Sequence, residues 1–353
     1  MDDEPDIPVR EWLPRTAALL AGTLALATAF IAAYVGTLHD PVPRDVPVGV
    51  VLGDQRAQAV MAAVRGETDK IEPVEYDDAA AADVGLTARE VYGVLTATPE
   101  GGLRLATASA SAPAAADVVD QVFAEAARRS DLPLTVTDEV PVEQTDPRGL
   151  VPFYLAVGYI LGGYLAATAL GLRTGTAPRS LASAGLRIAV LAAYAVVLGV
   201  VGALVVGPVL DIWHHDVPAV AAVGALAVFA AAMIASAMQG WLGLFGTGLA
   251  ILLLVVLGNP GSGGIYAPEF LPAWIRGMHR WNVPGLTTDL IKSAVYFDRR
   301  SMGWPLGGLA LWVALGVVGL LTATLVRGRH AGARHSGGTP ATCDDARPGG
   351  AGG

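Results

Sequence analysis

The stretch from Asp146 to Leu172 constrains the fold more than any other part of the chain. Asp146 and Arg148 are the last charged residues of a long polar segment, and the residues from Gly149 to Leu172 carry no charge. A helix needs roughly 20 apolar residues to cross the hydrocarbon core of a bilayer. The segment before this run therefore belongs outside the membrane, and the chain after it is expected to lie mostly inside.

The composition of the whole chain agrees with a membrane protein. Only 16% of its residues are charged, whereas soluble domains carry about 25%. Its mean hydropathy is +0.50. The net charge of −9 argues against a nucleic-acid partner, because phosphate binding needs clusters of Lys and Arg. Cys343 is the only cysteine, which excludes an intrachain disulfide and a cysteine metal cluster.

Long apolar runs predict an α-helical integral membrane protein with six transmembrane helices. The first run could be a signal peptide, but it exceeds the usual apolar region of about 7–15 residues and no clear cleavage site follows. We therefore expect an uncleaved anchor. Only Gln239 and Gly240 separate the fourth and fifth runs, which predicts a tight hairpin, with one long broken element as the alternative. The runs are Thr16–Leu38, Leu150–Leu172, Ile188–Pro208, Val217–Ala237, Gly240–Leu257 and Pro305–Val326.

The segment 39–149 is expected to form a small external α/β domain between the first and second membrane helices. Strand-like apolar runs alternate with helix-like runs, and a Pro-Glu-Gly-Gly turn predicts a hairpin. The segment is acidic, which indicates a solvated surface rather than a cation site. Strands are expected at 46–52, 71–76, 90–98, 103–109 and 132–140, and helices at 55–65, 77–86 and 113–129.

Arginines near the ends of the runs predict the orientation, because they favour the cytoplasmic side. They precede the first run, separate the second from the third and follow the sixth. With six crossings these clusters share one side, so we expect a multi-pass protein of the plasma membrane with both termini cytoplasmic. The remaining parts would be a cytoplasmic segment 1–15, a five-helix bundle at 150–326 with an external loop at 258–304, and a disordered cytoplasmic tail at 327–353.

Motifs for catalysis and cofactor binding are missing from the sequence. The expected spans hold no Asp, Glu, Lys, Arg or His, which argues against a proton-coupled transporter. No P-loop and no nucleophile elbow is present, so we expect neither an enzyme nor a cofactor. His214, His215 and Asp216 are neighbours, but adjacent residues rarely converge on one metal. An interfacial loop is the preferred interpretation, and no metal site is expected.

The external loop contains two amphipathic stretches that begin at prolines, PEFLPAWIRGMHRW and PGLTTDLIKSAVYF. Their aromatic residues suit the interface between membrane and water. Two short interfacial helices are therefore expected before the last span. Trp274 and Trp281 are expected in the interface zone. For Arg276 and Lys292 a solvated face is the preferred interpretation, with contact to membrane lipid headgroups or an amphiphilic substrate as the alternative.

Four features together resemble the permeases of the type-2 ABC exporter superfamily, and most of all the phage-infection-protein-like (Pip-like) membrane proteins. One span precedes the external domain and five follow it. VPVGVVLGD resembles the opening strand of that group, and AREVYGVLTATP (88–99) its middle strand. LPAWIRGMHRWNVPGLTTDLIKSAVYF (271–297) resembles the superfamily's loop before the last span, with Lys292 as its basic residue.

The resemblance implies a permease subunit of an ATP-driven exporter for a lipid-like, glycan or drug-like cargo. It would work as a homodimer or paralogue dimer, powered by a separate cytoplasmic ATPase. Gly158, Gly162 and Gly163 favour close helix packing, within the bundle or at a dimer face. We expect the ATPase to dock on Trp12, Arg173, Arg179 and Arg187. The alternative is a non-transporting envelope scaffold or accessory protein whose external domain binds a protein or wall component.

Overall fold

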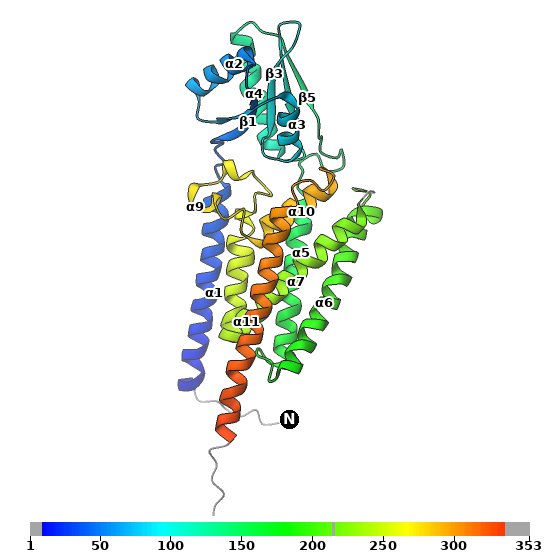
Figure 1. The fold of residues 1–353 in the computed structure, drawn as a ribbon. Coiled ribbons are helices and arrows are strands. Elements are labelled where there is room, and N and C mark those ends of the chain that lie inside the picture. The colour runs from blue at the N-terminus through cyan, green and yellow to red at the C-terminus, as the bar shows by residue number, and fades with distance from the viewer. Residues whose placement is uncertain (1–8, 214–215, 336–353) are drawn as a thin grey trace, which may run out of the picture.

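The computed structural model describes residues 9–213 and 216–335, which form a sheet domain stacked on one end of a helical bundle (Figure 1). We call that end of the bundle the domain end and the opposite one the far end. Five helices of the bundle are long and apolar enough to cross a membrane. Many of their Leu, Val and Phe side chains are exposed, as expected where lipid replaces water. The prediction of a multi-pass helical membrane protein is confirmed at this level.

Helix α7 is the centre of the bundle and packs against α5, α6 and α11. The contact with α5 depends on small residues, because a Cβ atom on Gly163 would overlap the carbonyl oxygen of Val228. Gly163 therefore packs inside the chain and does not mark a dimer face. The bundle consists of α1 (Val9–Leu38), α5 (Val151–Thr174), α6 (Leu181–Leu204) with η1 (Val205–Val209), α7 (Val217–Leu242), α8 (Leu244–Ile251) with η2 (Leu252–Leu257), and α11 (Gly303–His335).

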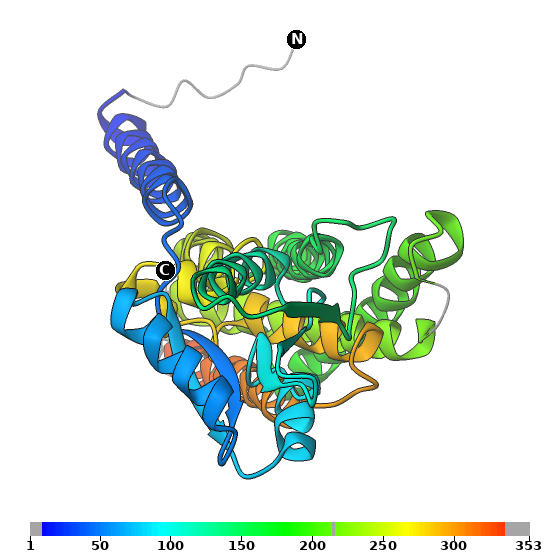
Figure 2. The same cartoon turned by 90° about the horizontal axis from the view of Figure 1, so that it is seen from above.

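Helix α1 stands apart from the other helices (Figures 1 and 2). Its main contacts are with η2 and η3 (Pro260–Ser262), near the domain end. Of the window that could span the membrane only 6% is buried, against 56% for α7. Helix α1 is thus held at one end, and most of its apolar surface is free to contact lipid or another protein.

The fifth apolar run differs from the sequence expectation. Its helical segment, Leu244–Leu257, is shorter than the five long helices and would extend roughly 20 Å at 1.5 Å per residue. The turn lies at Gly243, whose φ of +62° suits glycine, and not at Gln239–Gly240. Gln239 is buried inside α7, where its amide donates to Thr168 and Thr247 at 2.9 and 3.1 Å. Gln239 therefore links α7 to α5 and α8 and does not mark the end of a helix.

The sheet domain (residues 39–149) has a five-stranded sheet of order β2-β1-β3-β4-β5. Strands β3 and β4 form the expected antiparallel hairpin, and the other pairs are parallel. Helices α2 and α4 pack on one core of the domain and α3 on the other. Every strand and helix expected in this segment is present: β1 (Val46–Val51), α2 (Gln55–Glu67), β2 (Ile71–Tyr76), α3 (Ala79–Thr87), β3 (Gly93–Ala97), β4 (Leu103–Thr107), α4 (Pro113–Arg129) and β5 (Leu134–Asp138).

The segment 258–304 joins the two parts of the molecule. Its first half holds only η3, η4 (Pro268–Phe270) and the single-turn helix α9 (Ala273–Arg276). Its second half forms α10 (Val283–Val295), which is buried along almost its whole length and packs against α5, α7 and α11. The expectation of a helix lying on the membrane surface is wrong for α10. Phe270 and Phe297 extend the two sheet cores into this segment.

The ends of the chain are more helical than expected. Helix α1 begins at Val9 and includes Pro14, although the membrane run was placed at Thr16. Helix α11 continues to His335, so the disorder predicted from residue 327 is wrong for residues 327–335. The expectation for 336–353 lies outside the described residues, as do His214 and His215.

Candidate functional site

A cavity of about 990 Å³ lies between the sheet domain and the bundle. Its wall comes from the turn before β3, the loop before α4, the segment 258–282, α10 and the start of α11. The inner wall is buried at Lys292 and Ser111, whereas Arg280 and Trp304 at the rim are exposed. The cavity is therefore a pocket with a closed polar interior and an open edge beside the first turn of α11.

Asp289 on α10 is the centre of a charged cluster in this wall. The Arg89 guanidinium forms a short ion pair with one carboxylate oxygen of Asp289. It also donates to the Asp289 carbonyl at 3.1 Å and to Ser293 Oγ at 3.3 Å. Nε2 of His279 lies 3.0 Å from the second carboxylate oxygen. One carboxylate thus joins α10 to the sheet domain through Arg89 and to the loop before α10 through His279.

The geometry favours a charged imidazolium at His279. Nδ1 lies 2.7 Å from the carbonyl oxygen of Ser262 while Nε2 faces Asp289, and only the protonated ring donates from both nitrogens. Burial alone would lower the pKa of His279, but the Asp289 carboxylate and the two hydrogen bonds together raise it. Burial would raise the pKa of Asp289, yet Arg89 and His279 hold it well below its usual range.

Lys292 lies one helical turn after Asp289 and is only 4% exposed. Its Nζ donates to the Ser111 carbonyl at 2.7 Å, which fixes α10 to the loop before α4. Burial lowers the pKa of Lys292 to about 8, and the nearby Arg89 charge acts in the same direction. The expectation that Lys292 lies on a solvated face is therefore wrong: the amine lies inside the junction.

A second set of contacts fixes the loop to the sheet domain around Glu269. Its carboxylate accepts a hydrogen bond of 2.9 Å from the Tyr92 hydroxyl, and its carbonyl accepts from the Arg44 backbone N–H at 3.0 Å. Arg276 donates to the same carbonyl at 3.2 Å and lies 3.4 Å from an Asp45 carboxylate oxygen. Both terminal nitrogens of the Arg276 guanidinium are thus engaged by the protein, while its buried Nε has no hydrogen-bond partner among the described residues.

The two tryptophans singled out in the sequence are exposed, Trp274 at 56% and Trp281 at 55%. Trp281 packs edge-on against Trp304 with ring centroids 4.9 Å apart. The Trp304 indole N–H donates to the carbonyl of Arg280 at 3.0 Å. Exposed tryptophans at the domain end are typical of the interface zone of a bilayer.

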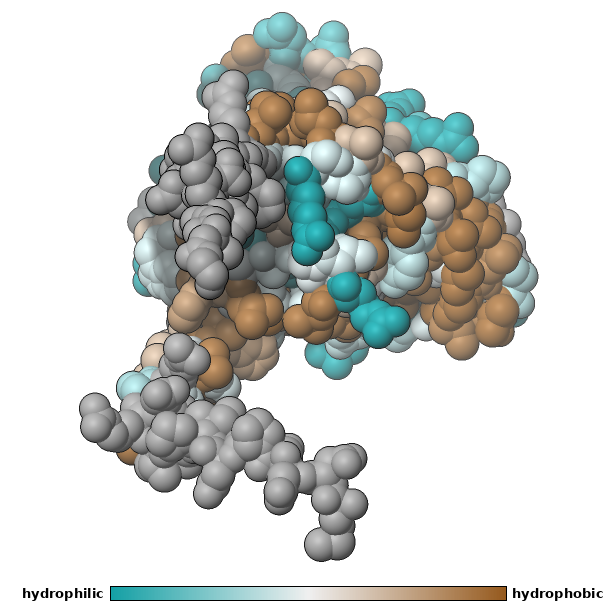
Figure 3. Space-filling model, turned by 90° about the horizontal axis from the view of Figure 1, so that it is seen from below, coloured by the Kyte–Doolittle hydropathy of each residue, from teal (hydrophilic) through white to brown (hydrophobic). Residues whose placement is uncertain are grey.

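The expected ATPase-docking residues do not form one exposed set. Arg173 and Arg179 are exposed at the far end, where hydrophilic residues lie between broad hydrophobic areas (Figure 3). Arg187 is 5% exposed, and its guanidinium donates to Thr174 and to the carbonyls of Gly175 and Thr176. It closes the turn after α5, so its assignment to a docking surface is wrong. Trp12 lies in α1, but its side chain is outside the described part.

An apolar groove of about 730 Å³ separates α1 from α8 and η2. Among the described residues that line it, Thr23 and Thr247 are the only ones with polar side chains. Because α8 starts just after the far-end turn at Gly243, the groove begins near that end and runs along the membrane-embedded surface. Its other lining residues are Ala18, Leu19, Gly22, Ala25, Leu26, Ala29, Leu244, Phe245, Gly248, Leu249 and Leu252.

Sequence reasoning did not identify the cluster of Arg89, His279 and Asp289. Arg89 and Asp289 are 200 positions apart, and no motif links them. The one available signal is the pair of opposite charges, Asp289 and Lys292, within an otherwise uncharged helix. Within the described ranges no group of His, Cys, Asp and Glu could hold a metal ion. No known protein family, curated protein or solved structure matches the chain.

Proposed function

We propose that this chain is the permease subunit of an ATP-driven exporter for a lipid-like cargo, and that a separate cytoplasmic ATPase powers it. The observation that carries the proposal is the apolar groove between α1 and α8. This groove is open to the bilayer and is bounded by the loosely packed helix α1. Its apolar lining suits an acyl chain that enters from the membrane. Helix α1 can move without breaking the core around α7, because most of its surface is unpacked.

The supply of energy is the second part of the proposal. Groups that take up and release protons inside the membrane are the usual sign of ion coupling, and the expected spans contain none. The chain also lacks a nucleotide-binding P-loop. An ATPase docked on the exposed Arg173 and Arg179 would supply the driving force. With the short segment Leu244–Leu257 as a sixth crossing, both termini and these arginines are cytoplasmic and the sheet domain is external.

Affinity purification from native membranes in mild detergent tests the proposal. Mass spectrometry should identify a stoichiometric partner with a Walker A sequence. The double variant Arg173→Glu and Arg179→Glu should lose that partner by charge repulsion. Arg56→Glu, an exposed arginine on the sheet domain, is the matched control and should keep it. Recovery of the chain without any ATPase would contradict the proposal.

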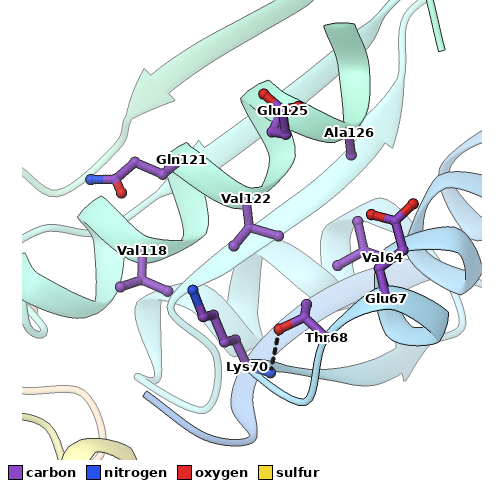
Figure 4. Close-up of a pocket in the computed structure, with 9 residues that line it drawn as sticks. All are labelled: Val64, Glu67, Thr68, Lys70, Val118, Gln121, Val122, Glu125 and Ala126. Carbon is purple, nitrogen blue, oxygen red and sulfur yellow. Dashed lines mark hydrogen bonds between the residues drawn. The ribbon is translucent and has the colours of Figure 1, made fainter. Parts of the chain in front are cut away.

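A scaffold function has one observation in its favour, a groove of about 280 Å³ between α2 and α4 (Figure 4). Val118 and Val122 lie on its α4 side, and Lys70 and Glu67 lie opposite. An apolar strip beside charged residues suits a protein partner. Val122→Glu should abolish capture of such a partner and leave export unchanged. If this variant instead loses export and still captures the same proteins, the scaffold function is contradicted.

A further inference from the structure

We propose that the junction cavity binds the phosphate group of an anionic phospholipid from the leaflet next to the sheet domain. The bound lipid would be the cargo of the proposed permease. Only this assignment as cargo rests on the proposed function.

The acidic side chains of the lining are already engaged by the protein. Asp289 is paired with Arg89 and His279. Glu269 accepts from the Tyr92 hydroxyl, and Glu90 accepts from Tyr76 at 3.2 Å. Of the three described carboxylates in the lining, Asp289 is thus balanced by charged partners. Glu269 and Glu90 keep their negative charge, which Arg276, Arg280 and Lys292 in the same lining outweigh.

Arg89 and Arg276 of the same lining are engaged in ion pairs and keep only a buried Nε–H without a partner. Two other basic side chains keep more donors for a ligand. Lys292 uses one of its three N–H groups on the Ser111 carbonyl and forms no ion pair within 4.0 Å among the described residues. The Arg280 guanidinium has no partner in the described part of the chain. Hydrogen bonds between ammonium or guanidinium groups and phosphate oxygens are short and strong. The cavity thus offers positive charge that the fold does not neutralise.

These two groups lie at different depths, which suits an amphiphile better than a free ion. Lys292 is buried in the inner wall and also borders a smaller cavity of about 220 Å³. Arg280 lies at the exposed rim, beside the paired rings of Trp281 and Trp304. A headgroup could reach Lys292 through this edge while its acyl chains stay in the bilayer along the apolar first turns of α11. Tryptophans at such an edge are typical of the headgroup level of a membrane.

The test is lipid binding to the purified full-length chain in detergent, followed by native mass spectrometry. Phosphatidylglycerol, phosphatidylcholine and diacylglycerol are titrated separately, and inorganic phosphate is a further arm. We expect one saturable phosphatidylglycerol site per chain, weaker binding of phosphatidylcholine, and no site for diacylglycerol. Lys292→Met should weaken phosphatidylglycerol binding by about tenfold or more, since it removes a charged hydrogen bond.

Arg280→Gln keeps the proposal testable if Lys292→Met fails to fold. Its side chain is exposed and forms no hydrogen bond or ion pair with the described residues, so the fold should be unaffected while phosphatidylglycerol binding weakens severalfold. Arg56→Gln is the matched control on the sheet domain and should bind like the unaltered chain.

Equal binding of phosphatidylglycerol and diacylglycerol would overturn the proposal, as would unchanged binding in both site variants. Displacement of the lipid by millimolar inorganic phosphate, with no gain in affinity from acyl chains, would show a site for a free anion and overturn the lipid assignment. None of these measurements needs the ATPase. A failure here is therefore distinguishable from a failure of the permease proposal.

Discussion

Asp289 is the residue whose charge holds the junction together, because its carboxylate has partners from two other segments. Asp289→Asn would leave Arg89 and His279 inside the protein without their counter-charge. Removing one partner of a buried ion pair typically costs about 3–5 kcal/mol. We expect a large fall in the thermal unfolding temperature in detergent, measured by circular dichroism.

The control for this prediction is Glu72→Gln, which removes the exposed pair between Arg65 and Glu72 on the sheet domain. Exposed pairs contribute about 0–1 kcal/mol, so this variant should unfold near the temperature of the unaltered chain. Similar effects of Asp289→Asn and Glu72→Gln would mean that the buried cluster does not stabilise the junction.

The raised pKa of His279 predicts that the stability of the folded protein depends on pH. The pKa of His279 is raised above 6.5 in the folded protein, so the folded state binds the proton more tightly than the unfolded state. This stabilisation is complete below the unfolded pKa and is lost as the pH rises through the folded pKa. Lys292 acts in the opposite direction, but only above its lowered pKa of about 8.

The measurement is therefore thermal unfolding in detergent between pH 6.5 and 8, where His279 dominates the junction. The unaltered chain should become less stable across this window. His279→Gln should remove most of that slope, because glutamine has no proton to lose. A variant that keeps the full slope would assign the titration to another group.

Individual residues at the junction and at the far end show the limit of prediction from sequence. Trp274 and Trp281 are exposed as expected, since an aromatic residue in a polar loop has a preferred place at an interface. Lys292 and Arg187 are both buried, because each satisfies backbone carbonyls that no sequence pattern reveals. Whether a cation faces solvent or a carbonyl depends on tertiary contacts between segments far apart in the chain.

At the scale of the element, the sheet domain was predictable and α10 was not. Short apolar runs that alternate with turn residues predict strands directly. The β3–β4 hairpin depends on local sequence alone. The amphipathic pattern of α10 also predicts the helix itself, but it does not predict what surrounds the helix. Its polar side chains face a neighbouring domain rather than water, and amphipathicity cannot distinguish these two polar environments.

Packing between α5 and α7 gives a prediction with a matched control on the same helix. Gly163→Ala places a Cβ atom against the Val228 carbonyl oxygen, whereas a Cβ atom on Gly158 meets nothing within 4 Å. Overpacking typically costs about 1–3 kcal/mol, while alanine in an open helical position gains up to about 1 kcal/mol over glycine. Gly163→Ala should lower the unfolding temperature in detergent and Gly158→Ala should not. Equal effects would show that α5 and α7 are not in close contact there.

At the scale of the whole molecule, the number of crossings decides the orientation of every other part. The five long helices followed from uncharged runs, since length and composition are sufficient to identify them. The fifth run, Gly240–Leu257, is different, because its helical segment Leu244–Leu257 is too short for a typical bilayer unless the membrane thins or α1 shelters the helix. The start of α11 lies at the domain end beside α10 (Figure 1), which requires that the chain return there after α7.

Cysteine labelling in intact cells tests this arrangement on a Cys343→Ser background, which has no other cysteine. Asp131→Cys on the sheet domain should react with a membrane-impermeant maleimide. Ser180→Cys in the turn before α6 and Arg327→Cys near the far end of α11 should react only after permeabilisation. If Leu244–Leu257 does not cross the membrane, α11 must run in the opposite direction and Arg327→Cys would be labelled in intact cells. That result would place the two ends of the chain on opposite sides of the membrane. Arg327 would then lie on the opposite side from Arg173 and Arg179.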